Sequence, residues 1–173
     1  MKNNRAVVNQ SPVEKQKVIA LVVIAVLALA GFILFLFKAT DHRAELMRAL
    51  GSRDPARLEQ LLKDHPGLVE AKLPNRSPSD TWEPLHMAAW DGNNEAIELL
   101  LKHKAKVNAR DANELTPLHY TVSRGRYDSA QLLINKGADM NAKGRDGRTP
   151  IELAKNLRDK RMIELFRIRG ARE

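Results

Sequence analysis

The sequence has no cysteine among its 173 residues, so no disulfide bond and no thiolate metal ligand contribute to its structure. This absence is compatible with a cytosolic domain and equally with a periplasmic one. A glycine-rich phosphate-binding loop, a nucleophile elbow and a paired-carboxylate arrangement are also missing. These absences argue against an enzyme, and neither a cofactor nor a metal is expected.

Charge is absent from one stretch of the chain, Val18–Phe37, in which fifteen of the twenty residues are Val, Ile, Leu or Phe. At 1.5 Å per residue, a helix of this length spans about 30 Å, which matches the hydrocarbon thickness of a bilayer. We therefore expect a single transmembrane helix over residues 18–37. A cleaved secretory signal is the alternative, with a small-residue pattern at Ala28-Leu29-Ala30, although the apolar run continues beyond that pattern.

The segment before this stretch, residues 1–17, is polar and basic and shows no apolar periodicity, so we expect a disordered tail there. Basic residues flank the apolar stretch in nearly equal number, which leaves the orientation of a membrane helix almost undecided. The stretch has no pair of small residues four positions apart, so no homo-oligomer is indicated. Asp41 is expected to cap a new helix directly after it, without a flexible Gly/Ser linker.

Repetition with a period of 33 residues organises the rest of the chain. Pro84, Pro117 and Pro150 each open a similar phrase, and the same offset relates Gly92 to Gly125. A period of this length indicates stacked modules, because each module buries its apolar face only against its neighbours. The sequence thus predicts a repeat architecture in which neighbouring modules stabilise one another.

Each module is expected to contain two short helices, one opened by the proline and one that follows the glycine. Apolar residues at helical spacing predict the second helices at Asn94–Lys102 and Asp128–Asn135. Gly137 is placed to end the latter in a left-handed conformation, whereas Lys104 occupies the same position one repeat earlier. A less regular helix pair in residues 41–72 indicates a diverged first repeat.

The repeated phrases resemble the ankyrin repeat. One nearly complete unit consists, in order, of Thr116-Pro-Leu-His119, Gly125, Leu132-Leu133, Gly137-Ala-Asp139 and Asn141-Ala142. The resemblance covers residues 73–173 well and residues 41–72 weakly. It implies an all-α solenoid of stacked antiparallel helix pairs, with a projecting loop in each repeat and a concave surface that binds proteins. We expect this domain over residues 41–173, with repeats at about 41–72, 73–110, 111–143 and 144–173, preceded by the transmembrane helix.

Two features that suggest other functions have simpler structural interpretations. His86 and His119 recur in successive repeats, but the helix axes of stacked repeats lie about 8 to 10 Å apart, too far for two rings to share zinc readily. We interpret both histidines as structural. The basic run Lys155–Arg172 could attract nucleic acid or anionic lipid, but Asp159 and Glu164 interrupt it, so we interpret it as solvated surface.

The resemblance implies that partners contact the positions that ankyrin repeats leave variable, on the loop tips and on the exposed side of each first helix. Both tryptophans of the chain occupy such positions, and tryptophan and arginine are enriched at binding hot spots. Either tryptophan could instead pack under the loop formed by residues 71–83. The candidate protein-binding residues are Trp82, Trp90, Asp91, Asn113, Leu115, Ser123, Arg124, Arg145 and Arg148.

Together these observations predict a non-enzymatic adaptor or scaffold that is tethered to a membrane and binds a protein partner. The alternative is a protective or inhibitory protein that masks an enzyme or toxin at a bacterial membrane. The charge comparison gives a slight preference for repeats on the periplasmic or exported side, with the cytoplasmic side nearly as well supported. Nucleic acid is not the expected partner.

Overall fold

A computed structural model describes residues 12–74 and 81–170 of the chain, which divides into two units, Met1–Asp41 and His42–Glu173. Helix α1 (Pro12–Ser52) contributes residues to both units. The second unit continues with α2 (Pro55–Asp64), the 3-10 helix η1 (Pro66–Glu70) and the antiparallel strands β1 (Leu73–Pro74) and β2 (Thr81–Trp82). Three helix pairs complete it: α3 (Pro84–Asp91) with α4 (Asn94–Lys102), α5 (Pro117–Ser123) with α6 (Tyr127–Asn135), and α7 (Pro150–Asn156) with α8 (Lys160–Ile168).

Helix α1 is longer than the sequence analysis predicts. It begins at Pro12, so residues 12–17 are helical rather than part of a tail, and residues 1–11 lie outside the described part of the chain. The helix also passes through Asp41 without interruption, so the prediction that Asp41 caps a new helix is wrong. Lys38-Ala39-Thr40 contains neither proline nor glycine, and lysine and alanine favour the helix, so nothing in this segment breaks it.

Large apolar side chains of α1 are exposed between Leu21, which is 67% exposed, and Phe32, which is 59% exposed. Within the residues that the structure describes, no helix combines the length and the apolar character that a membrane crossing needs. The predicted span over residues 18–37 is only partly covered by this description. The side chains of residues 18–19 and 33–37 lie outside it.

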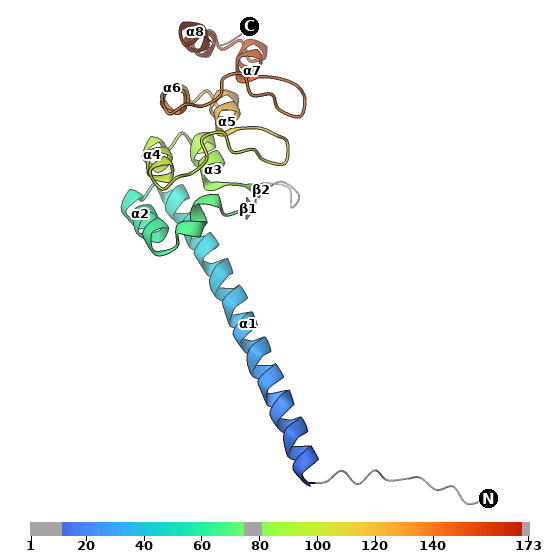
Figure 1. The fold of residues 1–173 in the computed structure, drawn as a ribbon. Helices are drawn as coiled ribbons and strands as arrows, with labels where there is room; N and C mark the ends of the chain where they lie inside the picture. The colour runs from blue at the N-terminus through green and yellow to red at the C-terminus, as the bar shows by residue number, and fades with distance from the viewer. Residues whose placement is uncertain (1–11, 75–80, 171–173) are drawn as a thin grey trace, which may run out of the picture. The chain divides into compact units, whose positions relative to one another are not determined.

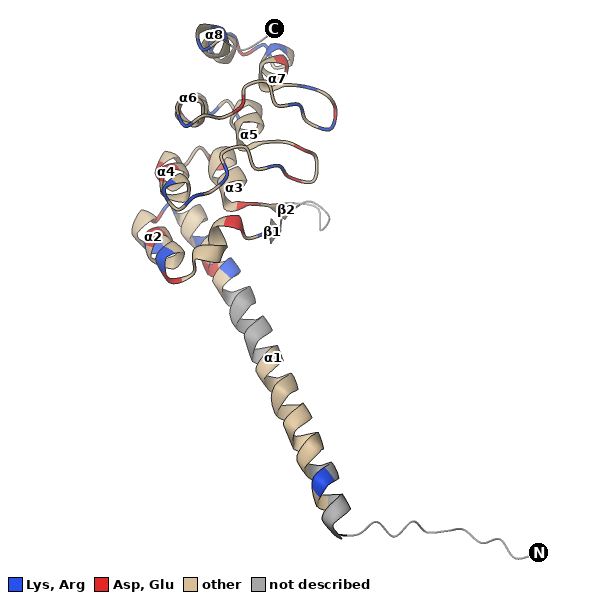
Figure 2. Cartoon of the chain, in the orientation of Figure 1, with Lys and Arg blue, Asp and Glu red and all other residues tan. Residues whose placement is uncertain are grey.

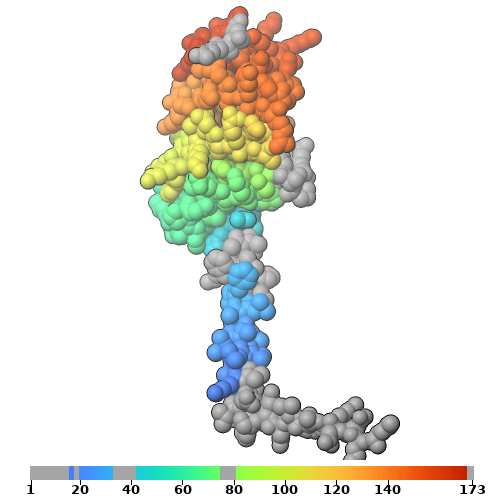
Figure 3. Space-filling model, turned by 45° about the vertical axis from the view of Figure 1, so that its right-hand side comes forward, coloured from blue at the N-terminus to red at the C-terminus, as the bar shows by residue number. Residues whose placement is uncertain are grey.

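The helix pairs of the second unit stack in chain order, and Figure 3 shows them as successive coloured layers. Helices α3, α5 and α7, which we call the inner helices, pack against one another. The outer helices α2, α4, α6 and α8 form a parallel column beside them (Figure 1). Long loops project from the side of the inner helices, before α5 and before α7. This arrangement confirms the all-α helical repeat fold.

The inner helices begin in the same way because each has proline at its first position, where the missing N–H group costs no hydrogen bond. In α7, the Glu152 carboxylate accepts the backbone N–H of Thr149 at 2.7 Å, and the Thr149 hydroxyl oxygen faces the N–H of Glu152. In α3, Glu83 replaces the capping threonine, and its carboxylate forms an ion pair of 2.7 Å with Lys72. The proline of the repeated phrase thus sets where each inner helix begins.

Each inner helix ends near a residue whose backbone is in the left-handed conformation, and this residue recurs at the same position in successive repeats. Gly92 and Gly125 have φ angles of 70° and 63°, and Arg158 adopts 56° where the third glycine would stand. Gly137 and Lys104, at the ends of the outer helices, have φ angles of 87° and 70°. The predicted left-handed end of these two helices is confirmed, and Lys104 holds a conformation that costs a residue with a side chain about 1 kcal/mol.

The core runs continuously through the stack. Each layer contributes fully buried apolar side chains to one cluster. The largest of these side chains include Leu62, Leu85, Leu100, Leu118, Leu133, Ile151 and Phe166. Because helices of seven to ten residues are marginal alone in water, this shared core stabilises every layer through its neighbours.

Candidate functional site

Each recurring histidine binds a projecting loop to the inner helix of the preceding repeat, His86 from α3 and His119 from α5. The Nδ1 atom of His86 accepts the backbone N–H of Glu83 at 3.2 Å, so its Nε2 atom carries the proton and donates to the carbonyl oxygens of Ala109 and Leu115. His119 forms the equivalent bonds to Thr116 N–H and Arg148 O, at 3.1 and 3.2 Å.

Burial lowers the pKa of both imidazoles from its ordinary value of 6.5. Both ring nitrogens of each histidine therefore serve hydrogen bonds within the fold, in line with the structural interpretation of these residues.

Three aromatic side chains, Trp82, Trp90 and Tyr120, form an aromatic cluster where β2, α3 and α5 meet. The ring centroids of Trp82 lie 4.7 Å from Tyr120 and 5.5 Å from Trp90, and those of Trp90 and Tyr120 lie 5.9 Å apart, all with tilted or edge-on rings. Trp82 is only 7% exposed, so the structure differs from the prediction that it lies on the variable surface. Trp90 is half-buried and keeps part of its ring accessible.

A chain of buried hydrogen bonds supports this cluster. The indole N–H of Trp82 donates to the hydroxyl oxygen of Tyr120 at 3.1 Å, and the Tyr120 hydroxyl donates to Oδ2 of Asp111. The other oxygen of Asp111 accepts the backbone N–H groups of Asn113 and Leu115, at 2.9 and 2.8 Å. We call Trp82, Tyr120 and Asp111 the buried relay, because it links β2, α5 and the loop before α5.

Four of the candidate binding residues meet at the C-terminal ends of α3 and α5. The guanidinium carbon of Arg124 lies 4.5 Å from the ring centroid of Trp90, which is a cation–π contact. The hydroxyl of the exposed Ser123 donates to the Tyr120 carbonyl at 3.0 Å. Asp91 follows Trp90 directly and is half-buried. A cation and an aromatic ring are thus presented together at the surface.

The finger loops, which we define as residues 103–116 and 136–149, are joined to each other by hydrogen bonds. The backbone N–H of Arg145 donates to the carbonyl of Asn113 at 2.8 Å. The guanidinium of Arg110 donates to the carbonyl of Lys143 at 2.8 Å. The side chains of Asn113 and Arg145 are both exposed. The two loops therefore present their tips at one continuous edge.

The other two candidates in the finger loops are tied into the fold more closely. The side chain of Leu115 is half-buried against Gly144, where an added Cβ would come within 2.7 Å of Leu115 Cδ2. Arg148 is exposed, and its Nε atom forms an ion pair of 2.8 Å with Asp146. Leu115 thus packs between neighbouring loops, whereas Arg148 remains on the surface. That any of the nine candidates contacts a partner stays a prediction.

Some residues of this surface escape the sequence analysis. Leu157 is 52% exposed at the end of α7 and stands 33 positions after Arg124. The repeat offset alone is the signal that identifies it. Tyr120 and Asp111 carry no such signal, because their partnership with Trp82 depends on packing between repeats.

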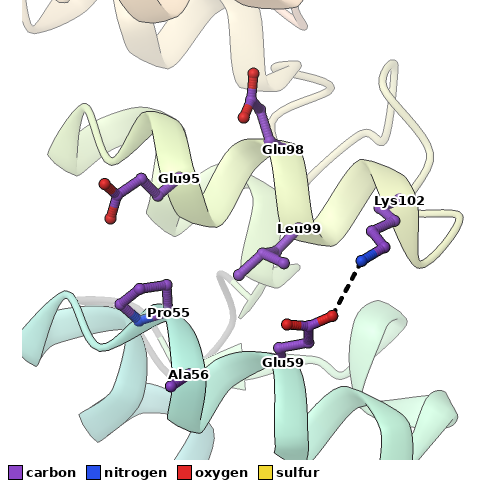
Figure 4. A pocket seen from close by; sticks show the side chains of 7 residues that line it. All are labelled: Pro55, Ala56, Glu59, Glu95, Glu98, Leu99 and Lys102. Atoms are coloured by element: carbon purple, nitrogen blue, oxygen red, sulfur yellow. Dashed lines mark hydrogen bonds and ion pairs between the residues drawn. The ribbon is translucent and has the colours of Figure 1, made fainter.

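A groove lies on the opposite column, between α2 and α4, with a volume of about 460 Å³. Figure 4 shows Pro55, Ala56 and Leu99 between the two helices, and the carboxylate of Glu59 pointing at Lys102, 3.0 Å away. The ion pairs with Lys102 and Lys63 hold the pKa of Glu59 below its usual value. Glu59 therefore contributes to the contact between these two layers.

Charge is distributed unevenly along the repeats. Residues 144–173 contain nine Lys or Arg and five Asp or Glu, whereas residues 41–143 contain fifteen of each kind. All the net positive charge of the repeat region thus belongs to its last part. Figure 2 shows blue residues along the finger loop before α7, which carries Lys143, Arg145 and Arg148.

Stacked helix pairs with projecting loops, and a surface built from inner-helix ends and loop tips, define a repeat protein of the protein-interaction class. The chain belongs to the ankyrin repeat family: the family model for three ankyrin repeats matches residues 46–144, more than half of its length. Ankyrin repeats typically bind protein partners and generally act without catalysis. No curated protein matches the sequence.

Proposed function

We propose that this protein is a non-enzymatic adaptor or scaffold that holds a protein partner on its inner helices and finger loops. The contact between Trp90 and Arg124 carries the proposal. Tryptophan and arginine are the side chains most enriched at binding hot spots, where a large contact area is combined with a directed polar group. Here Trp90 is half-buried and the exposed Arg124 lies beside it.

Preorganisation supports the same surface. The rings of Trp82 and Tyr120 contact the ring of Trp90 and so restrict its position. Hydrogen bonds within the buried relay hold Trp82 and Tyr120 in place. Hydrogen bonds between the finger loops hold Arg145 beside Asn113. A surface that is already ordered loses little conformational entropy when a partner binds, so more of its contact energy becomes affinity.

Capture of a partner tests the proposal. The full chain, solubilised with its native membranes and isolated under mild conditions, should retain a specific protein, and Arg124→Ala should reduce the amount retained at least tenfold. Glu98→Ala, on the outer helix α4, is the matched control, because Glu98 is also exposed but belongs to the opposite column. Equal capture by all three proteins would overturn the proposed surface. A captured enzyme whose activity falls on binding would identify the protein as an inhibitor rather than an adaptor.

Attachment to a membrane is the second part of the proposal. The charge-free sequence Val18–Phe37 and the exposed apolar side chains of α1 support it, because a continuous apolar surface of this kind marks contact with lipid or protein. Ile24→Lys with Leu27→Lys should release the protein from membranes into alkaline carbonate, since each lysine costs about 2.5 to 3.5 kcal/mol at the centre of a bilayer. If alkaline carbonate released the unaltered chain and the variant to the same extent, the proposed membrane anchor would be contradicted.

For the side of the membrane, we propose that the repeats face the exported side. Only the small excess of positive charge before the apolar stretch supports this choice. Alkaline phosphatase fused after Glu173 should then be active, and a fluorescent protein at the same position should be dark. The reverse pair of results would place the repeats in the cytoplasm.

A further inference from the structure

The ends of the inner helices form a row of accessible side chains with mixed character. Trp90 and Leu157 contribute apolar surface from α3 and from the residue after α7, and Arg124 contributes a cation between them, after α5. Leu157 is 52% exposed and Arg124 is exposed. We call these three residues the helix-end row. Their positions in consecutive layers place a positive charge between two apolar contacts.

Further cations lie on the adjacent finger loop. Lys143 and Arg145 are exposed, and neither forms an ion pair with any residue that the structure describes. By contrast, Arg148 in the same loop is paired with Asp146, and Arg110 in the neighbouring loop lies 3.6 Å from the carboxylate of Glu114. Among the cations of residues 143–148, Lys143 and Arg145 therefore have no ion-pair partner within the described part of the chain, and their charge is available to a partner.

Contacts within the fold connect the helix-end row to these cations. Trp90 touches Tyr120, whose hydroxyl donates to Asp111 at the base of the first finger loop. The turn that follows Asp111 contains Asn113, whose carbonyl accepts the N–H of Arg145 on the next loop. One uninterrupted chain of contacts thus joins the apolar side chains and the basic loop.

A partner that covers this surface removes its cations from water. Desolvation of an unpaired charge is costly, and complementary charge on the partner offsets the cost and raises the association rate. The net positive charge of residues 144–173 also attracts a negatively charged partner, and it does so over a longer distance. The surface is therefore suited to negative groups with apolar neighbours.

We propose, on the basis of the protein-binding function proposed above, that the partner presents an acidic segment containing large apolar side chains. Its carboxylates contact Arg124, Lys143 and Arg145, and its apolar side chains contact Trp90 and Leu157. The carboxylates form charge-assisted hydrogen bonds with the two guanidinium groups, which hold planar anions in a fixed geometry.

A nucleic acid, the other polyanion that a basic surface attracts, fits these observations less well. Asp146 and Glu114 lie in the finger loops among the cations and would repel a continuous line of phosphates. Arg124 already covers a face of the Trp90 ring, so that face is not open for stacking a base. Discrete carboxylates that avoid the acidic positions suit the surface better.

Selection from a displayed library of random 16-residue peptides tests the inference on the full chain in a neutral detergent. The selected peptides should be enriched in Asp and Glu together with Leu, Phe or Trp. A synthetic selected peptide should lose at least tenfold in affinity for the Arg124→Glu, Arg145→Glu variant. Replacing its acidic residues by lysine should restore binding to that variant.

The Arg48→Glu, Lys160→Glu variant is the matched control, because it changes the net charge equally at exposed positions that belong to neither the helix-end row nor the finger loops. It should alter the affinity less than twofold.

If the selected peptides are neutral or basic and their binding still requires Trp90, the acidic partner is ruled out, whereas the proposed protein-binding function is retained. Tighter binding of a 20-nucleotide oligothymidine, lost with Arg124→Glu and Arg145→Glu, would overturn it in favour of nucleic acid. Binding of no peptide in a Trp90-dependent manner would count against both proposals.

Discussion

Tyr120 supports the candidate surface from within, because its hydroxyl group connects two buried polar groups that have come from different layers. It accepts a hydrogen bond from Trp82 and donates one to Asp111. Asp111 is only 8% exposed, and its remaining hydrogen bonds come from the backbone of its own turn. The geometry of the accessible residue Trp90 thus depends on groups that a partner never touches.

Replacing Tyr120 by phenylalanine should lower the free energy of unfolding by about 1 to 3 kcal/mol, because it leaves the Trp82 indole N–H and a carboxylate oxygen of Asp111 without this partner. Chemical denaturation of the full chain measures the change. Tyr127→Phe is the matched control, since Tyr127 is half-buried against Arg161 and should lose less than about 0.5 kcal/mol. Equal losses in the two variants would contradict the buried relay.

The two structural histidines predict that stability falls in mild acid. Burial lowers the pKa of His86 and His119, so above pH 6.5 both are neutral in the folded and the unfolded chain. Below pH 6.5 the unfolded chain binds protons that the folded chain does not. Stability should therefore decrease by up to about 1.4 kcal/mol per pH unit for each histidine, until the pH reaches the lowered pKa.

Urea denaturation at a series of pH values from 7.5 to 5 measures this dependence. His119→Gln should be less stable than the unaltered protein at pH 7.5, because the imidazole bonds are lost, but should show a shallower decrease toward pH 5. If the unfolding free energy of His119→Gln fell with pH as steeply as that of the unaltered protein, His119 would not contribute to the pH dependence and the prediction would be wrong.

Among the helices, polar contacts link successive members of the outer column. Lys102 of α4 meets Glu59 of α2, Ser129 of α6 donates to Asn94 of α4 at 2.5 Å, and Arg169, after α8, donates to Asn135 of α6. Surface contacts of this kind are individually weak. Their regular placement, together with the shared core, explains how such short helices persist.

Because each layer contacts only its neighbours, damage at one end of the stack should remain local. Asp159→Ala removes the carboxylate that accepts the Met162 N–H at the start of α8, a cap worth about 1 kcal/mol. Hydrogen exchange should then accelerate in α7 and α8 but not in α2. Asp54→Ala, which removes the equivalent cap of α2, should show the opposite distribution. Acceleration throughout the domain in either variant would contradict this account.

Sequence reasoning succeeded where local chemistry and the repeat period act together. The predicted helix Asn94–Lys102 is confirmed as α4, and the helix predicted at Asp128–Asn135 begins one residue earlier, as α6. The break predicted at Asp41 is wrong, because a capping residue alone does not end a helix that contains no breaker. The predicted boundaries of the four repeats stay a prediction.

The site was less accessible to the same reasoning. Trp82 was expected on the exposed surface, yet it is buried, and Tyr120, 38 residues away, supplies a partner for its indole N–H. No spacing in the sequence indicates that pairing. Arg124 and Trp90 were predicted as separate candidates, and their contact emerges only from the stacking of α3 on α5.

In the whole molecule, helix α1 with its apolar stretch precedes an ankyrin repeat domain whose net positive charge is concentrated in residues 144–173. An anchored domain would meet its partner in two dimensions, at a higher local concentration than free diffusion gives. The inner-helix ends and finger loops provide the proposed contact, and the outer column supports them.

Photocrosslinking in intact cells tests the central claim most directly. A photoreactive amino acid at Ser123, which is exposed beside Arg124, should capture one specific protein partner, and the same group at Glu98 on the outer column should not. Arg124→Ala should abolish the product from position 123. A product formed at position 98 but not at position 123 would contradict the claim that the inner helices and finger loops hold the partner.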